Sequence, residues 1–319
     1  MARIEKILIC VHPKRPDTIL IEHVVDVAKK FGAAVKVFHV VSEYPQDMSE
    51  WWNVRNPEKL HDKIVSEREG YLKDVAARLK KAGVKQVDYE LAWGKSFLCI
   101  TREVLKNHHD LVMITSRDRS KVGRMLLECP SMDLMSHCPC TLWISRGKLP
   151  VRERRVLAAL SWKGGEEVCM PLNAKILRTA AALAASSTSE LHVIHALPLY
   201  GGEGSKGKGL RSDLAAYVDR LRAEILEQCT SLVAPQHLSL DASHIHLITG
   251  SPASVISAFA GEHGMDVIVL GTVARTGIPG LLVGNTAAQV FDQVQASMVV
   301  VKPDDFVSLV ELEESKCRD

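Results

Sequence analysis

The sequence predicts an α/β protein of two tandem doubly wound domains, each with a five-stranded parallel sheet flanked by helices. Three observations predict it. The chain has 319 residues, which is enough for about two domains. It repeats itself at an offset near 150 residues, whereas solenoid repeats span only about 20–50 residues. Short apolar segments alternate with helical ones, and parallel strands need such crossover helices.

The repeat is visible from the order of matching segments in the two halves. His39 and His195 end the second apolar run of each half, 156 positions apart. The other matching pairs of segments are 4–12 with 153–161, 89–94 with 245–250, 110–115 with 266–271, and 141–144 with 299–302. Between these strands, apolar residues recur at helical spacing in 23–31, 66–81, 174–184 and 213–229. We therefore expect a first domain at residues 1–147, a second at 152–305, and a charged tail at 306–319.

Composition excludes several classes of protein. Lys plus Arg number 40 and Asp plus Glu 38, a net charge of +2, which disfavours a nucleic-acid-coating protein. No apolar run approaches the roughly 20 residues that span a bilayer, and no secretory signal is visible. Eight cysteines are too few for a disulfide scaffold. We expect a cytoplasmic protein with no nucleic-acid or membrane partner.

Metal and catalytic patterns are weak. Cys138 and Cys140 follow His137, but a metal site needs a second pair of ligands at a set spacing, so we expect a turn entering a strand. Likewise, we interpret 108–110 as a helix-to-strand turn, and His39 and His195 as structural histidines. No Ser-His-Asp set, Cys-His set or close carboxylate pair can be assembled. The sequence predicts a binding protein, with slow nucleotide hydrolysis at most.

The glycine-rich segment 271–286 is the strongest candidate site. It follows a buried strand, and ligands of doubly wound sheets bind at the carboxyl ends of strands. Gly284 precedes an apolar helical pattern, so free N–H groups at that helix start could hold a phosphate. The alternative is a glycine-rich turn capped by Asn285 or Thr286.

This segment resembles the nucleotide-binding motif of the universal stress protein family, Gly-x2-Gly-x9-Gly-(Ser/Thr) after the fourth strand. Gly271, Ala274, Gly284 and Asn285 fall on its positions. The resemblance covers essentially the whole chain and implies a tandem member: a cytoplasmic stress-response protein that acts as a binding or signalling module, with ATP in the second domain. The candidate nucleotide-binding residues are Gly271, Ala274, Arg275, Gly284, Asn285 and Thr286.

The resemblance also implies that the two domains pair with each other, and it shows positions at which this chain differs from the nucleotide-binding members. Single-domain members dimerise, so we expect an internal pseudo-dimer in which 141–144 meets 299–302; a homodimer of the tandem chain stays open. Family members that bind nucleotide carry an acidic residue after the first strand, where this chain has His12 and Ser161. In the first half, Thr115, Asp118 and Glu128 stand at the three glycine positions of the motif. We expect the first half to bind no nucleotide.

Two inserted loops leave alternatives open. Trp51 and Trp52 lie in a polar insertion of the first half. They suit either a lid over a pocket for an apolar or amphipathic small molecule, which makes the protein a carrier, or local packing at the sheet edge. The glycine-rich stretch 201–209 lacks the spacing of a phosphate-binding loop, and we expect a surface loop there.

Overall fold

The computed structural model describes residues 4–13, 18–41, 57–116, 130–146, 154–162, 166–185, 189–197, 208–236, 238–272 and 284–312, with the backbone alone at 57–60, 166–170 and 208–214. These residues form two compact units. The first unit consists of the described residues of 4–146 together with 306–312, and the second unit consists of those of 154–305.

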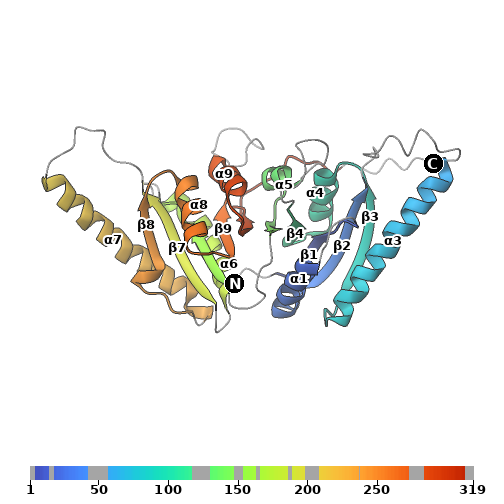
Figure 1. Ribbon diagram of the computed structural model, residues 1–319, viewed down its shortest axis with the longest axis horizontal. Helices are drawn as coiled ribbons and strands as arrows, with labels where there is room; N and C mark the ends of the chain where they lie inside the picture. The colour runs from blue at the N-terminus through green and yellow to red at the C-terminus, as the bar shows by residue number, and fades with distance from the viewer. Residues whose placement is uncertain are drawn as a thin grey trace. The chain divides into compact units, whose positions relative to one another are not determined.

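The first unit is built on a five-stranded parallel sheet with the strand order β3-β2-β1-β4-β5 (Figure 1). Its strands are β1 (Lys6–Cys10), β2 (Ala34–Val41), β3 (Val87–Trp93), β4 (Leu111–Thr115) and β5 (Thr141–Ser145). Its helices are α1 (Thr18–Phe31), α3 (Pro57–Lys81), α4 (Ser96–Asn107) and α5 (Ser131–His137). Right-handed crossovers place the helices that lead toward β3 on one face and those that lead toward β5 on the other.

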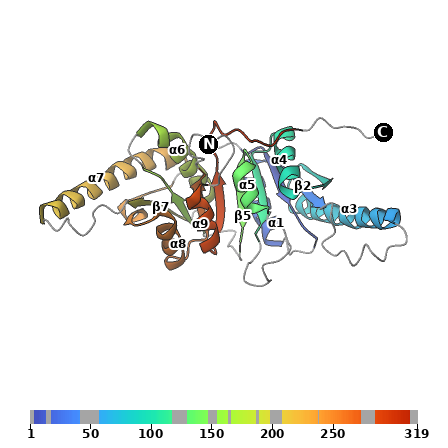
Figure 2. The same cartoon turned by 90° about the horizontal axis from the view of Figure 1, so that it is seen from above.

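The second unit repeats this arrangement with the strand order β10-β9-β6-β7-β8. Its strands are β6 (Arg155–Ala159), β7 (Glu190–Leu197), β8 (Ile245–Thr249), β9 (Val267–Gly271) and β10 (Ser297–Val301). Its helices are α6 (Glu166–Ala184), α7 (Lys208–Val233), α8 (Pro252–Glu262) and α9 (Asn285–Gln293), with short 3₁₀ turns η1 (Ala234–Gln236) and η2 (Ala242–His244). Figure 2 shows α6 and α7 on one side of this sheet and α8 and α9 on the other. The predicted fold class, two doubly wound α/β domains, is confirmed.

The central strands are buried on both faces, which explains their continuous apolar sequence. Ile7, Leu8 and Ile9 of β1 are each 0% exposed, and all of β10 is buried. Helices begin earlier than the apolar pattern predicts: α3 begins at Pro57 and α6 at Glu166. The first turns of α3 contain charged residues that favour a helix without contributing to an apolar stripe.

The internal repeat extends to individual hydrogen bonds. Asp110 accepts from the backbone N–H of Lys6 at 2.9 Å, and Asp266 accepts from that of Arg155 at 2.8 Å. The side chains of the same two basic residues donate to helix-terminal carbonyls, Lys6 to Asn107 at 3.0 Å and Arg155 to His263 at 3.2 Å. In each unit, one carboxylate and one cation therefore fasten the start of the central strand to the end of the helix before β4 or β9.

A glycine follows the edge strand at the same place in both units. Gly94 and Gly250 have φ values of 133° and 153°, and their N–H groups donate to Val41 and Leu197 carbonyls at 3.0 Å each. A Cβ on Gly250 would lie 2.8 Å from Val255 Cγ2. Because φ is positive and the space is occupied, glycine is the residue that fits this turn.

The C-terminal segment 306–312 belongs to the first unit, an association that the sequence does not signal. Ser308 Oγ donates to the His137 carbonyl at 2.7 Å, and Arg102 Nε donates to the Glu311 carbonyl at 3.3 Å. These bonds attach the segment to α5 and α4. Within the described ranges, the structure contains no helix that is both long and apolar enough to cross a bilayer.

Candidate functional site

Four of the six candidate nucleotide-binding residues lie at the end of β9 or at the start of α9. β9 ends at Gly271, and α9 begins at Asn285 with Gly284 as its N-cap and Thr286 as its second residue. Because β9 and β10 are parallel neighbours, the helix that joins them starts at the carboxyl edge of the sheet. Ala274 and Arg275 lie outside the described residues.

Gly271 has a packing role that does not depend on any ligand. A Cβ there would lie 2.7 Å from Leu172 Cδ2 and 3.2 Å from Ile176 Cδ1, both on α6. Its backbone does not require glycine, because no positive φ occurs at this residue. The close approach of α6 to β9 is therefore sufficient to explain this glycine.

Among the described residues, no side-chain hydrogen bond caps the start of α9, where Gly284 has φ −53° and ψ 128°. The first backbone bond at this end runs from the Ala288 N–H to the Gly284 carbonyl at 3.2 Å. The N–H groups of Asn285 and Thr286 precede it and have no partner within the helix, as in the first turn of any helix. This end of α9 can therefore donate hydrogen bonds to an anion.

Thr272 is a polar residue at this edge that the sequence interpretation missed. It follows Gly271, is 2% exposed, and its Oγ1 has no hydrogen-bond partner in the structure. Its backbone N–H donates to the Val301 carbonyl at 3.1 Å, which holds the residue at the ends of β9 and β10. A buried hydroxyl without a partner costs free energy. The signal available in the sequence was its position directly after a buried strand.

An asparagine side chain hydrogen-bonds to the backbone just beyond the end of β6. Asn173 on α6 accepts from the Ser161 N–H at 3.1 Å and donates to the Ser161 carbonyl at 2.9 Å. Ser161 stands where family members that bind nucleotide carry an acid. In this chain, both backbone groups of that position are already bonded to a side chain from within the unit.

His39 and His195 make the same structural contact in the two units. His39 Nδ1 lies 2.9 Å from the Val11 carbonyl, and His195 Nδ1 lies 3.2 Å from the Leu160 carbonyl. Both rings are buried at 5% exposure. Each ring joins its second strand to the end of the neighbouring central strand, which supports the structural interpretation of these histidines.

The remaining sequence candidates in the first unit are also structural. His108 has φ 54° and caps α4, as expected of a helix-to-strand turn. Cys138 and Cys140 lie between α5 and β5 with their sulfur atoms 3.6 Å apart. Burial raises the pKa of the Cys140 thiol, which disfavours a reactive thiolate. Asp118, Trp51, Trp52 and most of the 201–209 loop lie outside the described residues.

A network of charged side chains connects β2, β3 and α4 of the first unit. Lys36 Nζ lies 2.7 Å from Glu103 Oε1 and 2.5 Å from Glu90 Oε2. His109 Nε2 and Asn107 Nδ2 contact the same Glu103 oxygen at 3.1 and 2.8 Å. Burial by itself would raise the pKa of Glu103, but the hydrogen bonds from His109 and Lys36 outweigh it and lower that pKa to about 2.

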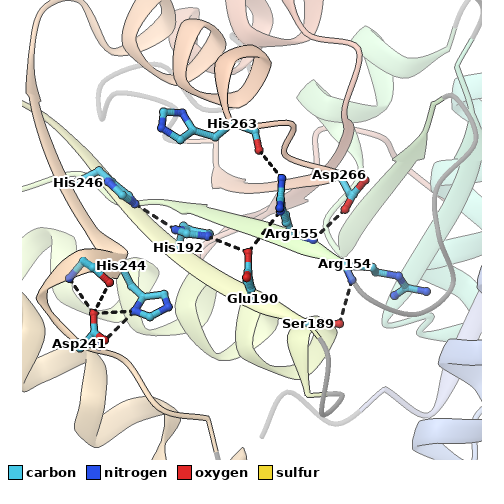
Figure 3. A network of polar contacts seen from close by, with 11 residues as sticks. Arg154, Arg155, Ser189, Glu190, His192, Asp241, His244, His246, His263 and Asp266 are labelled. Carbon is cyan, nitrogen blue, oxygen red and sulfur yellow. Dashed lines mark hydrogen bonds and ion pairs between the residues drawn. The ribbon is translucent and has the colours of Figure 1, made fainter.

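The corresponding place in the second unit holds histidines (Figure 3). His192 on β7 and His246 on β8 face each other, with Nδ1 of the former 3.1 Å from Nε2 of the latter. Glu190 Oε2 lies 3.6 Å from His192 Nε2 and 3.3 Å from Arg155 Nε. Burial lowers the pKa of His246 to about 4 and also lowers the pKa of His192. The sequence analysis, anchored on His39 and His195, missed this pair.

These histidines do not form a ready metal site. Among the residues that the structure describes, no three His, Cys, Asp or Glu side chains are placed to hold one ion. The His192 and His246 ring centroids are 5.3 Å apart and their facing nitrogens 3.1 Å apart, so the nitrogens lie close to the line between the rings. They point at each other, as in a hydrogen bond, and not at a shared third point.

Comparison with known proteins finds relatives that are similar to this chain over nearly its whole length. The chain is 25% identical over 316 residues to universal stress protein E of Salmonella typhi, covering 98% of this chain and 99% of that protein. It is 24% identical over 318 residues to universal stress protein E of Escherichia coli K12, covering 99% of each. The crystal structure of a putative universal stress protein from Pseudomonas aeruginosa UCBPP-PA14 superposes with a TM-score of 0.72 at 22% identity, covering 96% of this chain and 95% of that one.

The family model accounts for both units. The model of the universal stress protein family matches residues 3–146 and again 170–302, which cover the whole sheet of the first unit and the strands β7 to β10 of the second. With two matched segments, two sheets of the same strand order and near full-length similarity to universal stress proteins, this chain belongs to the universal stress protein family.

Proposed function

We propose that this stress-response protein is a binding module whose second unit holds an adenine nucleotide, with ATP as the first candidate, where β9 ends and α9 begins. The observation that carries the proposal is the uncapped start of α9 at Gly284. Backbone N–H groups there, together with the positive end of the helix dipole, favour a phosphate.

The buried Thr272 hydroxyl supports the same location. It has no hydrogen-bond partner in the structure and follows the glycine that ends β9. A phosphate or ribose oxygen arriving at this edge would supply the missing partner and relieve the desolvation cost of the hydroxyl. Gly284, Asn285 and Thr272 thus offer donors from two adjacent elements to one ligand.

Recognition of the ribose must differ from that of family members with an acidic residue at the end of the first strand. Ser161 occupies that place, and its backbone is held by Asn173 at 3.1 and 2.9 Å. A neutral, internally bonded group attracts ribose hydroxyls less than a carboxylate does. We therefore propose weaker nucleotide binding than the complete family motif provides, and binding without fast hydrolysis.

Isothermal titration calorimetry of the full chain with Mg-ATP tests the proposal. Gly284→Leu should abolish binding, because its side chain would stand at the helix start, while φ −53° and ψ 128° are accessible to leucine and preserve the fold. Thr272→Val removes only the hydroxyl and should weaken binding by roughly five- to twentyfold.

The matched control is Gly261→Ala on α8. A Cβ there meets nothing within 4 Å, so this glycine substitution in the same unit should leave the affinity unchanged. Unchanged ATP affinity in Gly284→Leu, with the fold verified by circular dichroism, would show that the nucleotide binds elsewhere.

A further inference from the structure

We propose that the His192–His246 pair is a proton-binding switch that loosens the β7–β8–α8 edge of the second unit at mildly acidic pH. The pair lies at the beginning of β8, far along the strands from the carboxyl edge considered above, so the proposal does not depend on nucleotide binding. It rests on the geometry of the pair and on the groups around it.

The pair accommodates one shared proton between its facing nitrogens. The nitrogens are 3.1 Å apart and lie nearly on the line between the ring centres, which is the geometry of a linear N–H···N hydrogen bond. If both facing nitrogens carried a proton, the two N–H groups would point at each other and repel. A doubly protonated pair therefore has to separate, and the two rings are attached to neighbouring strands.

Glu190 determines which ring donates. Its carboxylate lies 3.6 Å from His192 Nε2, which favours a proton on that nitrogen and leaves His192 Nδ1 as the acceptor. His246 then donates from Nε2, and its Nδ1 is the atom that an additional proton would occupy. Because Glu190 partly offsets the lowering of the His192 pKa, whereas the pKa of His246 is lowered to about 4, His246 on the edge strand β8 resists the additional proton more than His192 does.

The surroundings disfavour that additional charge. The His244 ring centroid lies 5.4 Å from that of His192, and the His263 centroid 6.3 Å from that of His246. The Phe259 ring, at 4.3 Å, fills the space beside His246, and Arg222 on α7 adds a positive charge nearby. The two carboxylates already have partners: Glu190 pairs with Arg155 at 3.3 Å, and Asp241 is bonded by Ser243 and His244.

The direction of the pH effect follows from the burial of the pair. An imidazole in an unfolded chain has a pKa of about 6.5. Burial lowers the pKa of His246 to about 4, with further lowering by His192 and His263, and burial lowers the pKa of His192. Between these values the unfolded edge binds more protons than the folded edge, so stability falls as the pH falls.

The position of the pair makes the effect local. β8 is the last strand of its sheet, and β7 is its only strand neighbour there. Opening an edge strand requires less free energy than unfolding the whole unit. In the first unit, the matching positions carry Lys36 and Glu90, 2.5 Å apart, an ion pair that contains no imidazole.

Hydrogen–deuterium exchange of the full chain at pH near 7 and near 5, corrected for intrinsic exchange rates, tests the proposal. Amides of β8 should lose roughly three- to tenfold more protection than those of β3, the edge strand of the first unit, a range reduced for partial solvent screening of the pair. The double variant His192→Lys with His246→Glu copies the first-unit pair and should remove this excess loss. His137→Gln, which changes an imidazole outside the pair, should leave it intact.

Equal losses in β8 and β3 of the native chain would overturn the proposal, as would an unchanged excess in the double variant. If the double variant does not fold, His246→Gln provides the same decision, because an amide can hydrogen-bond to His192 without titrating. A second measurement on the native chain is the NMR titration of the His246 ring, assigned from that variant. A midpoint at about 6.5, the ordinary value, would also contradict the switch.

Discussion

The same place in the two units is occupied by different chemistry. In the first unit, Lys36 joins Glu90 and the buried Glu103 in a charged network. In the second unit, 156 positions later, His192 and His246 share a hydrogen bond beside Phe259. Both networks join the second and third strands of their sheet to the helix that follows. The fold therefore needs a connection at this place but does not determine its chemistry.

Elsewhere the units have kept the same bonds. Asp110 and Asp266 each accept from the backbone at the start of the central strand, and Gly94 and Gly250 each close the turn after the edge strand with φ above 130°. These contacts satisfy backbone groups that any doubly wound sheet leaves at its strand ends. The difference teaches that the backbone contacts maintain the fold, whereas side-chain networks near the surface are free to acquire separate properties.

Exchanging a residue between the units should give the largest effect. Gly271 corresponds to Thr115 of the first unit, and Gly271→Thr would place its Cβ 2.7 Å from Leu172 Cδ2. We expect the free energy of unfolding of the second unit to fall by about 3 kcal/mol, because the added side chain would overpack the core there. Calorimetric unfolding measures it, with Thr115→Ala as the control in the first unit. A loss below about 0.5 kcal/mol would mean that α6 can move away without cost.

Breaking the charged network should destabilise the first unit alone. Glu103→Gln leaves Lys36 with Glu90 but removes the buried carboxylate that His109 and Asn107 contact. We expect a loss of about 2 kcal/mol near pH 7. The pKa of Glu103 is lowered to about 2, so this contribution is complete above about pH 5 and disappears as the pH falls through 2. Equal stability of the variant and native chains at neutral pH would contradict this assignment.

Acidification should separate the stabilities of the two units without any substitution. Between pH of about 6.5 and 5, the histidine pair should reduce the stability of the second unit by roughly 1 kcal/mol after allowance for solvent screening. The ion pair at the matching place in the first unit contains no imidazole. Thermal unfolding across this pH range should therefore lower the transition of the second unit more than that of the first. Equal shifts of both transitions would contradict the expected difference in pH dependence between the two units.

Removing the shared carboxylates should give the smallest and most symmetric effect. Asp110→Ala deletes the acceptor of two backbone N–H groups, those of Glu5 and Lys6, and Asp266→Ala deletes the acceptor of one, that of Arg155. Because these bonds are exposed, we expect each substitution to cost roughly 0.5 kcal/mol in its own unit. Urea unfolding of the two variants tests the equivalence, and a cost confined to one unit would show that the repeat is not maintained at this contact.

Much of the fold could be predicted from the sequence, because its determinants are local. The repeat, the apolar strands and the glycine after each edge strand are all visible in the printed residues. The match between Asp110 and Asp266 also falls within the aligned segments. By contrast, the attachment of Ser308 to α5 depends on a contact over 171 positions, for which no periodic pattern exists.

The candidate site was harder to predict, because the same residue type serves packing and binding. Gly271 was interpreted as a place for a ligand to approach, yet the close contact with Leu172 explains it without one. Thr272 became a candidate only when its burial and lack of a hydrogen-bond partner were known. His192 and His246 lie 54 positions apart, and only the pairing of β7 with β8 brings them together.

The central functional claim is that the two units differ in nucleotide binding. The sequence of the first unit has Thr115, Asp118 and Glu128 at the glycine positions of the motif, whereas the second unit keeps Gly271 at the end of β9 and Gly284 at the start of α9. The carboxylates of Asp118 and Glu128 at motif positions disfavour a phosphate in the first unit.

Equilibrium dialysis of the full chain against labelled ATP tests this claim most directly, because it counts the sites. The account predicts saturation at one nucleotide per chain and loss of that site in Gly284→Leu. Saturation at two nucleotides per chain, or one site that persists in Gly284→Leu, would contradict it.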